Sequence, residues 1–305
     1  MKYKIVFFGV KEVSEKVIDY LVKNNYKIDL IVSIDSKVAK RNEISGYKDL
    51  KRISKKYSID YLPVKDYSFK DKDDINFFKK NSFEIGICHP WQRLIPEEIL
   101  SSFKFGVFGF HGSSFSLPKG KGRSPLNWSL IEDKKIIRNN FFKYVSEADA
   151  GDIYNITNFE INEHDNIRTL EYKQLIDVKF QIKNLLNDYK NNVISLSKQK
   201  GTSTFYPKRS PNDGKIDFNN KTQGIYNLIR AVTKPFPGAF CYKMDEIIYI
   251  WDAKPFDKLF DFSKFKNGEI IDLFDNFPIV KTLDGSLIIY NYEAKKKLKI
   301  GDILS

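Results

Sequence analysis

His111 stands at a point in the sequence where proton-transfer chemistry is expected. A short apolar run ending at Phe110 predicts a strand, and a loop rich in Gly, Ser and Pro follows His111. Asp149 follows a second apolar run. A titratable imidazole at a strand end, with a carboxylate on another loop, is typical of general acid–base catalysis. We therefore predict that His111 and Asp149 are catalytic. Taken alone, His111 could equally be a hydrogen-bonded core or loop histidine, and Asp149 a turn residue before Gly151.

The loop after His111 also carries positive charge. Backbone N–H groups of a glycine-rich loop can approach a substrate closely, and basic side chains attract anionic groups. The basic candidates in this loop are Lys119, Lys121 and Arg123. We expect them to contribute to substrate binding.

The remaining histidines and the cysteines indicate no metal site. His89 ends another predicted strand and is interpreted as a loop histidine that holds a turn, while Trp91 could line a pocket for a flat heterocycle. His164 is interpreted as a solvated residue at a helix start. Cys88 and Cys241 lie far apart in the sequence, so neither metal-ligand spacing nor a disulfide framework follows from them. We expect no metal and a reducing, cytoplasmic location.

Strands and amphipathic helices alternate in the first 200 residues. Lys4–Phe8, Glu12–Lys23 and Asp29–Ile34 form a β-α-β opening. Further predicted strands cover 61–64, 83–88 and 106–110. The pattern predicts an α/β fold with a Rossmann-like, doubly wound, mostly parallel sheet. Such sheets bind ligands beyond the C-terminal ends of their strands, where His111 is expected. The dinucleotide-binding glycine pattern is absent after Gly9, so NAD is not expected.

A second, smaller domain is expected at residues 201–305, after a catalytic domain at residues 1–200. A long helix predicted over Asp165–Asn192 comes before this boundary. Beyond the boundary, a helix near Thr222–Val232 precedes several short strands, with Asp284-Gly285 as a hairpin turn. This pattern predicts a mixed or β-rich domain with an OB-like barrel.

The chain has a formal net charge of +12, with most of the basic excess in its first two thirds. A lysine-rich solvated surface explains this charge, and attraction to the phosphates of a nucleotide, a folate tail or RNA is the alternative. No arginine-rich run or aromatic RNA-binding signature occurs. No apolar run approaches the roughly 18 residues of a membrane span, so no membrane association is expected.

In its motifs the sequence resembles the N10-formyltetrahydrofolate-dependent formyltransferases, a family that includes methionyl-tRNA formyltransferase. Residues 110–128 resemble the family's histidine motif, and residues 149–153 resemble its D-x-G-D-I segment. Residues 91–96 resemble the segment that lines the folate site. Residues 208–217 and 229–240 look like the second domain of the amino-sugar branch. The likeness is greatest to formyltransferases that act on nucleotide-linked 4-amino-4-deoxy sugars.

The resemblance implies roles for individual residues. The catalytic residues it implies are His111 and Asp149. Those implied to bind N10-formyltetrahydrofolate are Trp91, Gln92, Arg93, Leu94, Ile95, Asp149 and Asp152. Those implied to bind the amine substrate are Ser113, Ser114, Lys119, Lys121, Arg123, Ser124 and Pro125. No metal is implied.

The implied reaction moves a formyl group from the folate to the primary amine of a nucleotide-linked amino sugar. Such a product would serve surface glycan biosynthesis, as in O-antigen or lipopolysaccharide. Methionyl-tRNA formyltransferase is the alternative within the family. It is disfavoured because an RNA partner needs a broad basic surface and the second domain is nearly balanced in charge. The oligomeric state stays open, with a homodimer among the options.

Gly109 is a departure from the family pattern, whose catalytic set is Asn-x-His plus Asp. The residue two positions before His111 is Gly109, so the asparagine is missing. Loss of one oxyanion donor typically lowers the rate about 10²–10³-fold. Either another donor replaces it, such as a backbone N–H of Gly112–Ser114 or a Ser or Asn side chain, or the enzyme is slow, or the chain binds folate or nucleotide sugar without turnover. We expect a substitute donor.

Overall fold

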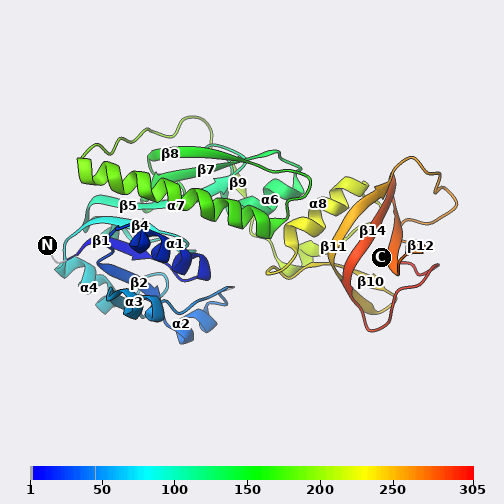
Figure 1. The fold of residues 1–305 in the computed structure, drawn as a ribbon, viewed down its shortest axis with the longest axis horizontal. Coiled ribbons are helices and arrows are strands. Elements are labelled where there is room, and N and C mark those ends of the chain that lie inside the picture. The colour runs from blue at the N-terminus through cyan, green and yellow to red at the C-terminus, as the bar shows by residue number, and fades with distance from the viewer. Residues whose placement is uncertain (1–2, 45) are drawn as a thin grey trace. The chain divides into compact units, whose positions relative to one another are not determined.

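The chain forms two compact units in a computed structural model that describes residues 3–44 and 46–305 (Figure 1). The first unit comprises residues up to 122, 138–159 and 172–205. The second comprises 123–137, 160–171 and 206–305. Two segments that precede residue 200 thus cluster with the later part of the chain. The division into domains at residue 200 remains a prediction.

The first unit is built on a seven-stranded sheet with the order β3-β2-β1-β4-β5-β7-β8. Its strands are β1 (Tyr3–Phe8), β2 (Leu30–Ile34), β3 (Asp60–Val64), β4 (Phe83–Cys88), β5 (Phe103–Ser113), β7 (Ile136–Lys143) and β8 (Ile153–Glu160). The strands from β1 to β5 pair in parallel, and β7 pairs antiparallel to β5. The expected Rossmann-like, mostly parallel sheet is confirmed.

Helices cover both faces of this sheet. They are α1 (Glu12–Lys23), α2 (Ser36–Arg41), α3 (Lys51–Tyr57), α4 (Lys72–Lys80), α5 (Glu97–Leu100) and α7 (Ile167–Asn191). Successive residues of a strand point to opposite faces, and β1 follows this rule. Phe7 packs in the apolar cluster that includes Leu21 of α1 and Ile182 of α7, whereas Phe8 packs in the cluster that includes Phe78 of α4. In Figure 1, α7 runs along one face of the sheet.

Strand β5 is longer than the sequence predicts, and the position expected for His111 is corrected accordingly. The predicted strand ends at Phe110, but β5 continues to Ser113. The reason is the antiparallel neighbour β7, which was not predicted: His111 pairs with Asn140 and Ser113 with Arg138. His111 therefore lies inside β5, two residues before its end, and pairing with β7 fixes its backbone on one side.

The second unit is a small barrel with two helices. Helix α6 (Pro125–Ile131) packs beside α8 (Thr222–Val232), and the amide nitrogen of Asn127 donates to the carbonyl of Ala231 at 2.7 Å. A five-stranded antiparallel sheet has the order β10-β11-β14-β13-β12. These strands are β10 (Ala239–Lys243), β11 (Glu246–Asp257), β12 (Ile270–Phe274), β13 (Phe277–Thr282) and β14 (Gly285–Glu293). A 3-10 turn, η1, spans Pro211–Gly214.

The edges of this sheet are joined by the last residues of the chain. Ser305 exchanges two backbone hydrogen bonds with Tyr242 of β10, and the carbonyl of Asp302 accepts one from Ile270 of β12 at 2.8 Å. This joining of the two edges agrees with the expected OB-like barrel. The remaining strands are the two-residue β6 (Lys121–Gly122) and β9 (Phe205–Tyr206).

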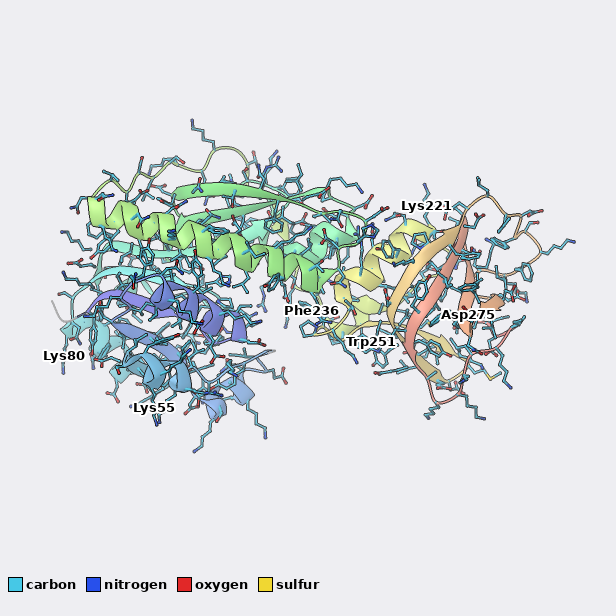
Figure 2. All side chains as sticks on the ribbon, in the orientation of Figure 1. Lys55, Lys80, Lys221, Phe236, Trp251 and Asp275 are labelled. Atoms are coloured by element: carbon cyan, nitrogen blue, oxygen red, sulfur yellow. The ribbon has the colours of Figure 1, made fainter. Side chains whose placement is uncertain are left out.

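Basic side chains extend from the surface of both units. Lys55 of α3, Lys80 of α4 and Lys221 before α8 are exposed (Figure 2). Their spread over separate elements agrees with a solvated, lysine-rich surface as one source of the positive charge. In the part of the chain that the structure describes, no helix combines the length and apolar character that crossing a membrane requires.

Candidate active site

His111 and Asp149, which are far apart in sequence, meet in the first unit. His111 Nδ1 lies 3.4 Å from Asp149 Oδ2, and His111 Nε2 lies 2.7 Å from the carbonyl oxygen of Gly120. The imidazole is almost fully buried. Asp149 has a φ of 53°, a left-handed conformation that aspartate tolerates in turns. Asp149 is therefore both a turn residue and the partner of His111, so the two interpretations drawn from the sequence are compatible.

The carboxylate of Asp149 is held in its charged form. Burial raises the pKa of this carboxyl, but the hydrogen bond and charge of His111 outweigh burial and leave the pKa lowered. The backbone N–H of Gly122 contributes by donating to Oδ2 at 3.1 Å. Gln199 Nε2 donates to the carbonyls of Asp149 and Gly151 at 2.9 and 2.8 Å, which fixes the turn. The site thus presents an ionised, positioned carboxylate to His111 at neutral pH.

Both ring nitrogens of His111 face oxygen acceptors. A neutral imidazole carries one N–H, whereas an imidazolium carries two. Only the protonated ring donates to both Asp149 and the Gly120 carbonyl, whereas in a neutral ring the unprotonated nitrogen faces one of these oxygens without a hydrogen bond. The arrangement therefore suits a group that accepts a proton during a reaction and is stabilised as a cation afterwards.

Asn140 holds the backbone that follows His111. Fully buried on β7 directly opposite His111, it donates through Nδ2 to the carbonyls of His111 and Phe115 at 2.9 and 3.1 Å. Its Oδ1 accepts a hydrogen bond from the backbone N–H of Leu117 at 3.0 Å. Asn140 is absent from the site predicted from sequence. The available signal was a pair of amide side chains, Asn139 and Asn140, directly before two phenylalanines.

The loop residues predicted to bind substrate differ in burial. Ser113 and Ser114 are buried, and Ser114 Oγ has no hydrogen-bond partner among the described residues. Lys121 is also buried, with Nζ 3.6 Å from a carboxylate oxygen of Glu147, whereas Lys119 is exposed. A buried hydroxyl without a partner is rare in proteins, and substrate binding by Ser114 remains a prediction.

Three further predicted substrate-binding residues belong to the second unit. They are Arg123, Ser124 and Pro125. Ser124 adopts a left-handed conformation with a φ of 56° directly before α6, and Pro125 is the first residue of that helix, a favoured position for proline. Their role in binding remains a prediction.

The segment predicted to bind folate combines buried and exposed residues. Trp91 is buried against Tyr67 and Phe69, with ring centroids 4.7 and 5.2 Å away. Its indole Nε1 is buried and meets no hydrogen-bond acceptor in the described part of the chain. The guanidinium of Arg93 lies 5.3 Å from the Tyr67 ring centroid. Of the other residues predicted to bind folate, Gln92 and Leu94 are exposed. Ile95 is buried and Asp152 is half-buried. Folate binding by these residues remains a prediction.

The second buried histidine, His89, makes packing and backbone contacts. His89 packs edge-on against the ring of Phe110 at 5.5 Å, and its backbone carbonyl accepts a hydrogen bond from Ser14. Burial, followed by the charge of Lys11, lowers the pKa of His89 to about 4. The ring is therefore neutral at neutral pH. Over residues 3–44 and 46–305, no group of three or more His, Cys, Asp or Glu side chains could hold a metal ion, and both cysteines are free.

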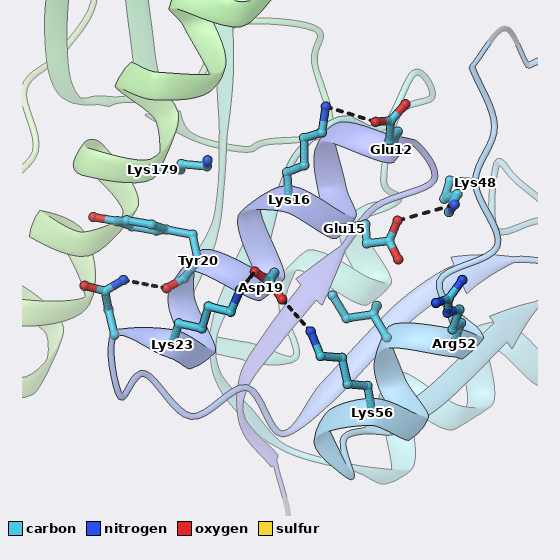
Figure 3. A pocket seen from close by; sticks show the side chains of 12 residues that line it. Glu12, Glu15, Lys16, Asp19, Tyr20, Lys23, Lys48, Arg52, Lys56 and Lys179 are labelled. Atoms are coloured by element: carbon cyan, nitrogen blue, oxygen red, sulfur yellow. Dashed lines mark hydrogen bonds and ion pairs between the residues drawn. The ribbon is translucent and has the colours of Figure 1, made fainter.

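A surface hollow elsewhere in the first unit is distinct from this site. It has a volume of about 570 Å³ and is lined mainly by charged residues of α1 and α3 (Figure 3). Its carboxylates are already paired, for example Glu12 with Lys16 at 2.9 Å and Asp19 with Lys56 at 2.8 Å. It includes neither His111 nor Asp149. The hollow is therefore not part of the candidate active site.

Two family models match the chain. The model described as formyl transferase matches residues 3–179, and the model described as formyl transferase, C-terminal domain, matches residues 208–305. Together they include the sheet that carries His111 and the barrel of the second unit. The chain belongs to the formyl transferase family.

Individual relatives differ in how much of their length the chain matches. The chain is 34% identical over 254 residues to the bifunctional polymyxin resistance protein ArnA of Wigglesworthia glossinidia brevipalpis, with 82% of this chain and only 38% of that protein covered. It is 30% identical over 253 residues to the methionyl-tRNA formyltransferase of Thermodesulfovibrio yellowstonii, with 82% and 80% covered. The crystal structure of the N-formyltransferase from Helicobacter canadensis shares the fold, with a TM-score of 0.66, 19% identity, and 94% of this chain and 98% of that chain covered.

Proposed function

We propose that this chain transfers a formyl group from N10-formyltetrahydrofolate to the primary amine of a nucleotide-linked amino sugar. The observation that carries the proposal is the contact between buried His111 and Asp149 near the C-terminal end of β5, in a chain of the formyl transferase family. The Helicobacter canadensis N-formyltransferase, which was crystallised with folinic acid and dTDP-3-aminofucose, supports a sugar substrate.

The proposed chemistry assigns the proton to His111. The neutral amine attacks the formyl carbon, and negative charge develops on the formyl oxygen. His111 takes the proton that the amine loses, and Asp149 positions the ring and stabilises the imidazolium. The bond from carbon to N10 then breaks, and N10 leaves with the proton that His111 returns. The unpartnered Ser114 Oγ and Trp91 Nε1 fit a site that binds polar ligands.

Methionyl-tRNA is the second candidate substrate, because one relative is a methionyl-tRNA formyltransferase. We favour the sugar since residues 201–305 are nearly balanced in charge, whereas an RNA partner requires many basic contacts. A 4-amino sugar remains our first choice. A role in surface glycan synthesis, a cytoplasmic location and a homodimer also remain predictions.

A substrate panel tests the proposal. The protein is incubated with N10-formyltetrahydrofolate and, in separate reactions, with UDP- and dTDP-linked 4-amino and 3-amino sugars or charged initiator methionyl-tRNA. Mass spectrometry then detects the addition of one formyl group, with His111→Ala as the matched control. A formylated sugar supports the proposal. Formylated methionyl-tRNA alone supports the second candidate, and saturable folate binding without any product supports a relative without turnover.

A further inference from the structure

The side chain of Tyr144, the residue directly after β7, fills the space beside Gly109 of β5. Gly109 of β5 pairs with Phe142 of β7, so Tyr144, two residues further on, is its diagonal neighbour. The backbone N–H of Tyr144 donates to the carbonyl of Val107 at 2.7 Å, which continues the pairing of the strands to this residue. A Cβ atom on Gly109 would lie 2.2 Å from the hydroxyl oxygen of Tyr144 and 2.3 Å from its Cζ. The phenol therefore fills the volume that a side chain at residue 109 would occupy.

This volume is on the side of the sheet that carries the catalytic candidates. Side chains two residues apart on a strand point to the same face, so the position of the missing Gly109 side chain and the imidazole of His111 share a face. The family motif described above has an asparagine at this position. Here the polar group in that space is the hydroxyl of Tyr144, the residue directly after the neighbouring strand β7.

We propose that Tyr144 is a catalytic residue, whose phenol donates a hydrogen bond to the formyl oxygen as negative charge develops there. The proposal rests on the formyl transfer proposed above. The phenol keeps its proton throughout, so the step exchanges its hydrogen bond to the Cys88 thiol for one to the formyl oxygen and changes no covalent bond. The donors expected from the sequence were a backbone N–H of Gly112–Ser114 or a Ser or Asn side chain. Tyr144 was not among them.

The surroundings of the hydroxyl suit a donor that waits for a strong acceptor. Its side-chain partner is the buried thiol of Cys88, which pairs with Gly109 on the other side of β5, and sulfur is a weak acceptor. Burial, then the neighbouring Cys88 and the negative charge of Asp149, raise the pKa of Tyr144 well above its ordinary value. The phenol thus stays protonated, and an oxyanion would compete well with the thiol for its hydrogen bond.

Removal of the hydroxyl alone is the first test. In Tyr144→Phe the ring stays, so we expect the melting temperature and the far-UV circular dichroism to stay close to those of the wild type. We expect kcat to fall about 10²–10³-fold, with a much smaller change in KM. Tyr154→Phe is the matched control, because Tyr154 lies on β8 and its hydroxyl donates to Asp188 of α7 at 2.7 Å. Wild-type kcat in a folded Tyr144→Phe protein would overturn the proposal.

A swap of donors is the second test, and it remains informative if Tyr144→Phe is unstable. Gly109→Asn alone should lose activity because the new side chain overlaps the phenol. Gly109→Asn combined with Tyr144→Ala places an amide donor in the vacated space, and kcat should exceed that of Tyr144→Ala by about 10-fold or more. A double variant no faster than Tyr144→Ala would contradict the proposal.

The two proposals fail in distinguishable ways. All variants are assayed with the amine that the wild-type protein formylates. If the wild-type protein formylates no amine of the panel, the proposed function and the role of Tyr144 are both overturned. If the wild-type protein is active and Tyr144→Phe matches it, only the role of Tyr144 is overturned.

Discussion

Nδ1 of His111 lies 3.4 Å from Oδ2 of Asp149, although one residue is within β5 and the other is in the turn that precedes β8. The carboxylate is oriented by the N–H of Gly122, and its turn is fixed by Gln199. The imidazole therefore depends on Asp149 for its orientation and for its stabilisation as a cation. Two groups that act as one unit give strongly non-additive effects on rate when each is removed.

Asp149→Asn should reduce kcat between about 10²- and 10⁴-fold while preserving the fold. An amide can donate to Nδ1 and so favours the wrong tautomer of His111, and it stabilises an imidazolium poorly. The double variant His111→Ala, Asp149→Asn should be little slower than His111→Ala. Steady-state kinetics on all three proteins check this. If the loss of kcat in the double variant equals the product of the two single losses, the two residues act independently.

His89 should make the protein less stable in acid. Burial lowers the pKa of His89 to about 4 in the folded protein, whereas an unfolded histidine has a pKa of about 6.5. Between these values the unfolded chain binds a proton that the folded protein does not. The free energy of unfolding should therefore fall as pH drops from about 6.5 to about 4, by up to about 3 kcal/mol from this residue.

Urea denaturation of wild type and His89→Asn over this pH range measures the effect of His89. The variant should lose less stability on acidification than the wild type. His164→Asn is the control, because it removes an exposed histidine in place of the buried one. Parallel profiles for wild type and His89→Asn would contradict the prediction.

Asn140→Ala should destabilise the fold by at least about 2 kcal/mol. The change leaves the carbonyls of His111 and Phe115 and the N–H of Leu117 without their partner in a buried position. It should also lower kcat, since the backbone of His111 loses a contact. Asn81→Ala, which removes one amide hydrogen bond at the end of α4, is the control and should cost much less. Similar losses for the two variants in chemical denaturation would refute the role of Asn140.

Gly109→Ala should cost about 1–3 kcal/mol of stability, because the added methyl group overlaps the Tyr144 ring and hydroxyl. In a Tyr144→Ala background the same change should cost much less. A double-mutant cycle on the free energy of unfolding measures this coupling. Gly224→Ala is the control, since nothing lies within 4 Å of a methyl group there, and it should be neutral or slightly stabilising. Equal costs of Gly109→Ala in both backgrounds would be inconsistent with the overlap.

The sheet and several helices follow from local sequence patterns. Helix α1 has the predicted bounds, Glu12–Lys23, because its apolar residues recur at helical spacing and Gly9 ends the strand before it. Strand β7 was not predicted. Its central Asn139 and Asn140 disfavour a strand locally, and they are accommodated only by partners such as Asp177 of α7, 2.7 Å from Asn139.

The closeness of Gly109 and the Tyr144 side chain has no local signal either. Sequence alone shows that a donor is missing at residue 109, because the residue there has no side chain. It does not show which distant residue enters the empty space, since that depends on the register between β5 and β7. By contrast, His111 and Asp149 were predicted because each follows an apolar run and each matches a short family motif.

The most direct test of catalysis at His111 follows the formyl group itself. N10-formyltetrahydrofolate with a carbon-13 label in the formyl group is mixed with wild-type protein or His111→Ala and the accepted amino sugar in single-turnover experiments. We predict that the wild-type protein moves the label to the sugar amine and that the folded variant does so at least about 10³-fold more slowly. Transfer by His111→Ala at the wild-type rate, or a label that stays on the folate with the wild-type protein, would contradict formyl transfer at this site.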